Sequence, residues 1–193
     1  MDFQKFNPDI HNCVEVAKLV AKSTDYHNLT YSSSSNLMDS LSKNIADNQL
    51  NFENIHILTK QSMYLGIIIF SYKKKSNSLF NDLKFLLTLK LNQFFQRLYI
   101  FLIENEIKMT DHDVYLDLIY IEPDFRNKGI GTKSINYLIE LVKLQSKKQI
   151  LLHVDRANLS ARSFYEKLGF KYMMNNSGES KNNHLAMSYN IKA

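Results

Sequence analysis

The clearest pattern of apolar and polar positions lies in the second half of the chain. Val114 to Ile121 is an apolar run that predicts a strand, and Gln149 to Val154 predicts another. Between them, Gly129 to Ser146 repeats its apolar residues at the spacing of an amphipathic helix. A short helix follows, with Asn158 as its cap and Gly169 where a helix end favours a left-handed residue. This alternation predicts an α/β or α+β fold with a mixed sheet.

The first half begins with a short strand and a helix. Met1 to Phe6 alternates loosely, which favours a strand. Asn7-Pro8-Asp9 combines an asparagine cap, a proline at the first helical position and an acid that complements the dipole, and it predicts a helix start. We expect Cys13 to be an unreactive member of the buried face of this helix. That face follows helical spacing and consists of Ile10, Cys13, Val14 and Ala17.

Several further elements surround these. A polar helix is expected from about Leu37 to Asn48, after a serine-rich break. Ile55 to Thr59 and Tyr64 to Tyr72 predict two strands, and their short link indicates an antiparallel hairpin. Phe170 to Met173 and Leu185 to Tyr189 are expected to be the closing strands.

An unusually long apolar segment separates the two halves. Leu79 to Ile107 is compatible with helix, but charged residues scattered through Leu79 to Ile103 exclude a comfortable membrane span. We expect one or two packed helices that complete the core. A lid over a substrate site, a dimer interface and a membrane-surface helix remain alternatives. The chain, residues 1–193, is then a single domain with a helical insertion at about 79–110.

Composition excludes several classes of protein. The chain has 193 residues and a net charge of +5, with 5 Gly, 2 Pro and one cysteine, so collagen-like and disulfide-stapled folds are excluded. The single cysteine and the polar N-terminus, without a signal sequence, favour a cytoplasmic protein. The six histidines show no metal spacing, so no metal site is expected. The lysines do not interleave with aromatic residues, so we expect no nucleic-acid partner.

The link between the strand and the long helix of the second half predicts an anion site. Gly129 and Gly131 open the helix, where free backbone N–H groups and the positive end of the dipole favour phosphate or pyrophosphate. Arg126 and Lys128 add positive charge. The sequence is not a Walker A loop, and Ser134 stands where a dinucleotide-binding fingerprint needs a third glycine.

A second motif follows at Asn158 to Phe170, and together the two segments resemble the GNAT superfamily of acetyl-CoA-dependent N-acetyltransferases. The cofactor loop of that family, Arg/Gln-x-x-Gly-x-Gly/Ala, is matched by Arg126, Gly129 and Gly131. Asn127 departs from the glycine of many members, but asparagine tolerates a left-handed turn. The downstream signature is matched by Asn158, Ala161, Phe164, Tyr165, Gly169 and Phe170. The resemblance implies a mixed, mostly antiparallel central sheet flanked by helices, with the apolar segment inserted before the fourth strand.

The resemblance also implies roles for individual residues, with acetyl-CoA as co-substrate. The backbone of Ile119, Tyr120 and Ile121 would pair with the pantetheine amides, and a backbone N–H near Ile121 would hold the oxyanion. Asn158 would contact the pantetheine arm, and the Tyr165 hydroxyl would protonate the departing thiolate. The pyrophosphate would be held by the basic side chain of Arg126 and by the N–H groups of Asn127, Lys128, Gly129, Ile130, Gly131 and Thr132.

The base that takes the proton of the amine is expected to be Asp117. A charged residue inside an apolar strand is unusual unless it is paired or functional, and an Asp bound to neighbouring backbone or to an arginine is the alternative. The segment Tyr-Leu-Asp-Leu also resembles the Tyr-Leu-Glu-Asp of polyamine acetyltransferases, whose glutamate is the base. Asp113 is a second candidate, and water is a third. His153 could line the site, although a satisfied strand histidine is the favoured interpretation.

The expected function is transfer of the acetyl group from acetyl-CoA to a primary amine by direct attack. The alternative is a non-catalytic acyl-CoA-binding module that serves as a sensor or binds a partner. The sequence does not identify the amine, because the first half carries no motif; protein N-termini, lysines, amino acids and aminoglycosides remain open.

Overall fold

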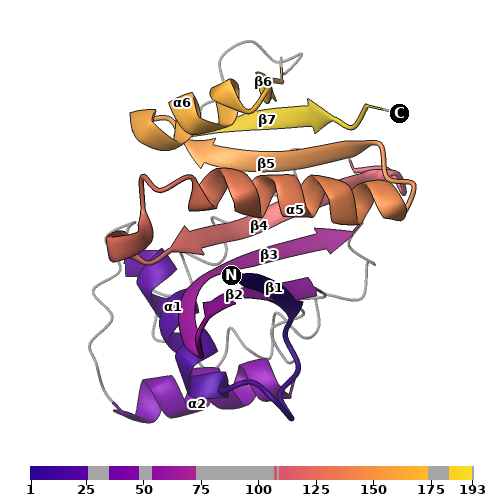
Figure 1. Cartoon of the computed structure of the whole chain (residues 1–193). Helices are drawn as coiled ribbons and strands as arrows, with labels where there is room; N and C mark the ends of the chain where they lie inside the picture. Colours follow the sequence, from indigo (N-terminus) through magenta and orange to yellow (C-terminus); the bar gives the residue numbers. More distant parts are fainter. Residues whose placement is uncertain (26–34, 48–53, 73–106, 108, 174–182, 193) are drawn as a thin grey trace. The chain divides into compact units, whose positions relative to one another are not determined.

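The computed structural model describes residues 1–25, 35–47, 54–72, 107, 109–173 and 183–192 of the chain. It contains two compact units, the first formed by Met1–Ser71 with Leu116–Leu141 and the second by Tyr72–Tyr115 with Val142–Ala193. Each unit is described by itself below (Figure 1). Tyr31 to Ser34 of the expected serine-rich break and all but three residues of the expected insertion at about 79–110 lie outside the described residues.

The first unit holds one edge of the sheet, in the order β1-β2-β3-β4. β1 (Asp2–Lys5) pairs antiparallel with β2 (Asn54–Lys60), and β2 pairs antiparallel with β3 (Met63–Tyr72). The expected hairpin is therefore confirmed. Its two linking residues, Gln61 and Ser62, have φ of 49° and 65°, and left-handed values at both positions match the twist of the flanking strands.

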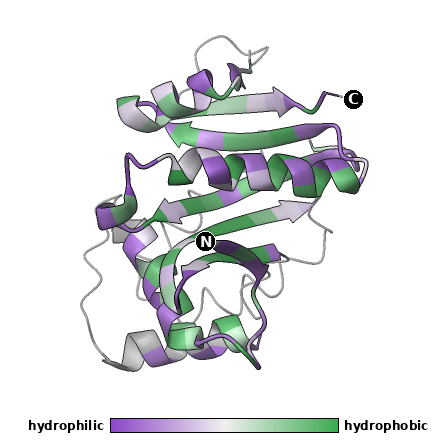
Figure 2. Ribbon diagram, viewed as in Figure 1, coloured by the Kyte–Doolittle hydropathy of each residue, from purple (hydrophilic) through white to green (hydrophobic). Residues whose placement is uncertain are grey.

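The helices of this unit cover a core built from isoleucines of the strands. α1 (Cys13–Asp25) and α2 (Ser35–Ala46) contribute apolar residues to it, and α5 (Ile130–Leu144) follows the end of β4. β3 is coloured mostly as hydrophobic in Figure 2, which agrees with the apolar run that predicted this strand. The buried cluster consists of Val16, Ala17, Leu19, Val20, Ala21, Leu41, Ile45, Ile55, Ile57, Ile67, Ile69 and Tyr120.

The expected start of the first helix is wrong. Asn7 closes only a turn, because its carbonyl accepts from the N–H groups of Ile10 (3.3 Å) and His11 (2.9 Å). α1 begins instead at Cys13, and Asn12 is its cap. Ile10 is consequently 73% exposed.

The buried face of α1 lies further along the chain than the sequence indicated. Val14 is 39% exposed and Cys13 is half-buried, so of the expected face only Ala17 is fully buried. Val16, Leu19 and Val20 supply the rest of the contact with the core.

The second unit holds the other edge, in the order β4-β5-β7-β6. Asp113 to Tyr115 of β4 (Asp113–Ile121) pair in parallel with β5 (Gln149–Asp155). The remaining pairs, β5 with β7 (His184–Asn190) and β7 with β6 (Lys171–Tyr172), are antiparallel. α6 (Leu159–Lys167) connects β5 to β6.

This pairing confirms the expected fold class, which combines a mixed, mostly antiparallel sheet with helices. Most predicted strands agree with the structure to within one or two residues at each end, and the shortest, β6, is two residues long. A single domain over residues 1–193 stays a prediction. Among the described residues, no helix is both long enough and apolar enough to cross a membrane.

Candidate functional site

The predicted anion-binding turn has the backbone that its sequence requires. β4 ends at Ile121, the short helix η1 (Pro123–Phe125) follows, and α5 begins at Ile130. Asn127 and Gly129 adopt left-handed φ values of 58° and 72°. A Cβ on Gly129 would meet nothing within 4 Å, so its conformation and not the available space explains the glycine. The turn therefore presents the first N–H groups of α5 as an anion site would.

The two basic side chains of the turn fold back onto it. Arg126 donates from Nε to the carbonyl of Ile121 at 2.8 Å, and its guanidinium lies 5.4 Å from the centre of the Tyr120 ring. Lys128 donates from Nζ to the carbonyl of Asp124 at 2.8 Å. Both side chains therefore stabilise the turn while their positive charge stays beside it.

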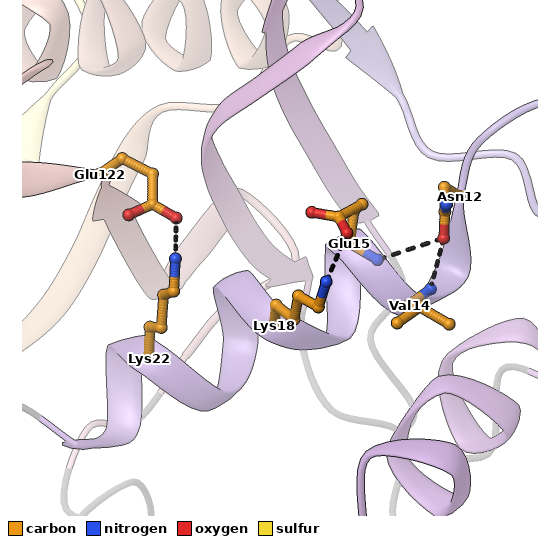
Figure 3. A network of polar contacts seen from close by, with 6 residues as sticks. All are labelled: Asn12, Val14, Glu15, Lys18, Lys22 and Glu122. Atoms are coloured by element: carbon orange, nitrogen blue, oxygen red, sulfur yellow. Dashed lines mark hydrogen bonds and ion pairs between the residues drawn. The ribbon is translucent and has the colours of Figure 1, made fainter. Parts of the chain in front are cut away.

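A network that the sequence did not reveal joins α1 to this turn (Figure 3). Lys22 Nζ lies 2.5 Å from Glu122 Oε1, and the Tyr120 hydroxyl donates to Glu122 Oε2 at 3.4 Å. The hydrogen bond that Lys22 donates to Glu122 is the main cause of a raised pKa for the Lys22 ammonium, while burial raises the pKa of Tyr120. No local signal could have found the ion pair, because its partners are 100 residues apart.

The end of β4 is also fixed against β3. The N–H of Glu122 donates to the carbonyl of Leu65 at 2.9 Å. The neighbouring Gly66 has no side chain, and a Cβ there would lie 2.5 Å from the carbonyl oxygen of Tyr120. The segment Ile119, Tyr120 and Ile121, expected to pair with pantetheine, is thus held in a defined position.

The two acidic candidates for the base have different surroundings. Asp117 is half-buried on β4 and accepts a hydrogen bond from the hydroxyl of Ser71 at 3.3 Å. Asp113 is buried, and its Oδ2 accepts from both the N–H (2.6 Å) and the hydroxyl (2.8 Å) of Thr110. The hydrogen bonds of Asp113 therefore close the turn that precedes β4.

In the second unit, the other motif folds as its residues indicate. Asn158 caps α6 by accepting from the N–H of Ala161 at 3.0 Å, and Gly169 ends the helix region with φ of 95°. Tyr165 is buried, with Phe164 and Phe170 at ring distances of 5.2 and 5.4 Å. Burial raises the pKa of the Tyr165 hydroxyl and so further favours its protonated form.

His153 lies on β5, and its two ring nitrogens have different surroundings. Its Nδ1 lies 2.8 Å from the hydroxyl of Tyr115, whereas its Nε2 is buried without a hydrogen-bond partner among the described residues. Burial, and to a lesser extent His184, lowers the pKa of His153 to about 4. The ring is therefore neutral at physiological pH.

The structure groups the candidate residues by unit. The segment from Asp117 to Thr132 belongs to the first unit, and Asn158, Tyr165 and His153 belong to the second. Across the described part of the chain, no three His, Cys, Asp or Glu side chains gather in a way that could hold a metal ion.

Comparison with known proteins agrees with these features. Residues 91–170 match the model of the acetyltransferase (GNAT) family. An uncharacterized N-acetyltransferase of Methanocaldococcus jannaschii is 43% identical over 53 residues, which are 28% of this chain and 24% of that protein. N-alpha-acetyltransferase 30 of Schizosaccharomyces pombe is 34% identical over 56 residues, which are 29% and 37% of the two chains. The matches thus span well under half the length of these curated relatives.

Solved structures share the fold over nearly the whole chain. The ribosomal-protein-S18-alanine N-acetyltransferase of Escherichia coli has a TM-score of 0.58 at 14% identity and covers 100% of this chain and 94% of its own. The PaiA N-acetyltransferase of Thermoplasma acidophilum, solved in complex with coenzyme A, has a TM-score of 0.61 at 14% identity, with 98% of both chains covered. The match of residues 91–170 to the family model, together with the glycine turn, the capped Tyr165 helix and this fold, supports a relationship of the chain to the GNAT acetyltransferases.

Proposed function

We propose that the chain is an N-acetyltransferase that moves the acetyl group of acetyl-CoA directly to a primary amine. The observation that carries this proposal is the turn before α5, where Asn127 and Gly129 adopt the left-handed backbone that an anion-binding helix start uses. A relative with the same fold was solved in complex with coenzyme A, which supports the same ligand here.

The turn would hold the pyrophosphate through backbone N–H groups from Asn127 to Thr132, with Arg126 supplying charge. The pantetheine arm would pair with the backbone of Ile119 to Ile121, as a neighbouring strand does. Asn158 would contact the same arm. Its side-chain oxygen caps α6, so the amide NH₂ is the group with which it would donate to the ligand.

Tyr165 would act as the general acid. The amine nitrogen bonds to the acetyl carbon and the carbonyl oxygen becomes an oxyanion; as this adduct collapses, the carbon–sulfur bond breaks and the sulfur takes the phenolic proton. A buried tyrosine has a raised pKa, but a thiolate that leaves into a buried environment also gains proton affinity, because burial disfavours both anions. An N–H near Ile121 would hold the oxyanion.

The proton of the amine would pass to Asp117. This carboxylate stands on β4 among apolar neighbours, and its hydrogen bond from Ser71 orients it. His153 competes for the same role, because its neutral ring has a buried Nε2 without a described partner. The lowered pKa of His153 makes it a weak base for an amine, so an intervening water would be needed there.

The coenzyme site is tested by melting the protein with and without acetyl-CoA. Ligand at a hundredfold its Kd adds about 2.7 kcal/mol, which raises Tm by roughly 5–10 °C for a chain of this size. Arg126→Glu combined with Gly129→Asp should abolish the shift, since both changes place negative charge at the turn and Asp tolerates a left-handed backbone. Lys43→Glu, an exposed charge reversal on α2, is the control that should keep it. No shift for the wild-type protein at millimolar acetyl-CoA would refute the proposal.

The chemistry is tested by turnover with released thiol as the readout. Tyr165→Phe should lower kcat by about 100-fold or more while the acetyl-CoA shift persists. Asp117→Asn and His153→Gln separate the two candidate bases: only loss of the true base removes the acidic limb of the pH profile of kcat/KM. A full melting shift without turnover on any amine would instead support the acyl-CoA-binding module.

The amines to be tested first are chosen from the names of similar proteins. One is named an N-alpha-acetyltransferase and another a ribosomal-protein-alanine N-acetyltransferase. We therefore propose protein α-amino groups as the first acceptors to screen. The screen compares a peptide that has a free N-terminus with a peptide whose N-terminus is acetylated and which carries an internal lysine. Acetylation of the lysine alone would redirect the assignment to side-chain amines.

A further inference from the structure

Glu122 brings a carboxylate to the boundary between β4 and the turn that carries Arg126. Its side chain is 19% exposed, so water only partly screens its charge. The same residue is fixed by its backbone, because its N–H donates to Leu65 on β3 and its carbonyl accepts from Phe125 of η1 at 2.9 Å. These bonds fix the backbone of Glu122 at the boundary, from which its side chain extends.

A negative charge at this place opposes the proposed ligand. The turn that follows Glu122 is the segment assigned above to a pyrophosphate, and like charges near one another weaken anion binding. Arg126 follows Glu122 by only four residues. An unpaired Glu122 carboxylate would therefore offset part of the favourable positive charge of Arg126.

Lys22 pairs with Glu122 and compensates its negative charge. Its ammonium lies 2.5 Å from Glu122 Oε1, although the lysine itself is half-exposed in the last turn of α1. The C-terminal end of a helix also favours a positive charge. From Glu122 the contacts continue through the Tyr120 hydroxyl to the ring face under Arg126. Lys22 thus belongs to a chain of contacts that ends at the turn.

We propose that Lys22 is a positioning residue for the coenzyme: by pairing with Glu122 it cancels the charge of that carboxylate beside the turn, so that the turn accepts an anionic ligand. This role rests on the proposed function, because it presumes that the turn binds the pyrophosphate of coenzyme A. It acts through Glu122 and involves no contact of Lys22 with the ligand.

The matched control stands one helical turn earlier on α1. Lys18 pairs with Glu15 at 2.6 Å, and its exposure equals that of Lys22 at 50% (Figure 3). Lys18→Met and Lys22→Met therefore remove the same charge from the same helix, but only Lys22 neutralises a carboxylate at the turn.

The test measures the Kd of coenzyme A by calorimetry for the wild-type protein, Lys18→Met, Lys22→Met, Glu122→Gln and the Lys22→Met/Glu122→Gln pair. Lys22→Met should weaken binding by ~3- to 10-fold relative to Lys18→Met. Removing the carboxylate as well should restore binding to within about twofold of the wild-type value. The ratio of the Lys22→Met Kd to the wild-type Kd should shrink toward one at ~0.5 M NaCl, because salt screens a charge effect but not a distorted turn.

Three outcomes would overturn the proposal. The first is equal affinity of Lys22→Met and Lys18→Met. The second is an effect of Lys22→Met that Glu122→Gln does not rescue or that salt does not reduce, which would make the pair a structural anchor. The third outcome concerns the case in which Lys22→Met does not fold. Lys22→Arg should then bind coenzyme A as the wild-type protein does, and Glu122→Gln alone should bind it no more weakly than the wild-type protein. Weaker binding by either variant would reject the role of Lys22. No binding of coenzyme A by the wild-type protein would refute the proposed function itself.

Discussion

Gly66 is the residue at which β3 leaves room for the end of β4. A Cβ at this position would lie 2.5 Å from the Tyr120 carbonyl oxygen and 2.8 Å from Ile121 Cδ1. We expect Gly66→Ala to lower the free energy of unfolding by about 1–3 kcal/mol, because the strands must separate to admit the methyl group. Urea unfolding followed by tyrosine fluorescence measures this change.

The double variant Gly66→Ala/Ile121→Val identifies the atom responsible. It removes Cδ1 of Ile121 but not the closer carbonyl oxygen, so it should recover only a small part of the loss. Full recovery would mean that the side chain, and not the approach of the two backbones, requires the glycine.

At the residue scale, the sequence predicts what depends on neighbours in the chain. Gly129, Asn158 and Gly169 have the backbone or cap that their local motif requires, and the structure agrees. The partners of Glu122 and His153 could not be predicted in this way. They lie 100 and 38 residues away along the chain, and periodicity carries no information about contacts at that separation.

At the scale of elements, the cap of α1 distinguishes the structure from the sequence pattern. Asn12 Oδ1 accepts from the N–H groups of Val14 (3.0 Å) and Glu15 (3.3 Å), as Figure 3 shows, whereas Asn7 Oδ1 accepts from the N–H of Asp9, which lies outside the helix. Asn12→Ala should therefore cost about 1 kcal/mol of stability, and Asn7→Ala clearly less. Denaturant midpoints of the two variants provide the comparison. A larger loss from Asn7→Ala would favour the helix start that the sequence indicated.

The strands were the easier elements to predict, and the reason is physical. β3 is a nearly continuous apolar run and β2 is buried over its first five residues, which leaves little choice of conformation, and the hairpin link fixes their pairing. The start of α1 was harder because Asn7 and Asn12 can both cap a helix. The choice between them depends on tertiary contacts such as the hydrogen bond from the Asn12 N–H to the Tyr64 hydroxyl at 2.8 Å.

At the scale of the whole molecule, each unit contains a histidine held in the neutral form. His56 in the first unit is 4% exposed, lies 2.8 Å from the Tyr137 hydroxyl and stacks on Phe70. Burial, with a smaller effect from Lys5, lowers the pKa of His56 to about 4. His153 in the second unit has a pKa of about 4 for the same main reason. Acid should therefore destabilise both units.

The sign and size of the acid effect can be given for His56. Its pKa lies below the ordinary value of 6.5, so the unfolded chain takes up a proton first and the stabilisation present above pH 6.5 is lost as the pH falls toward 4. The difference in pKa corresponds to about 3 kcal/mol, or roughly 6–12 °C in Tm. In melts between pH 7.5 and 4, His56→Gln should flatten the fall in Tm by that amount, since Gln can still bond to Tyr137. His112→Gln, at an exposed position, should leave the curve unchanged. Parallel curves for the wild-type protein and His56→Gln would mean that protonation of His56 costs the fold nothing.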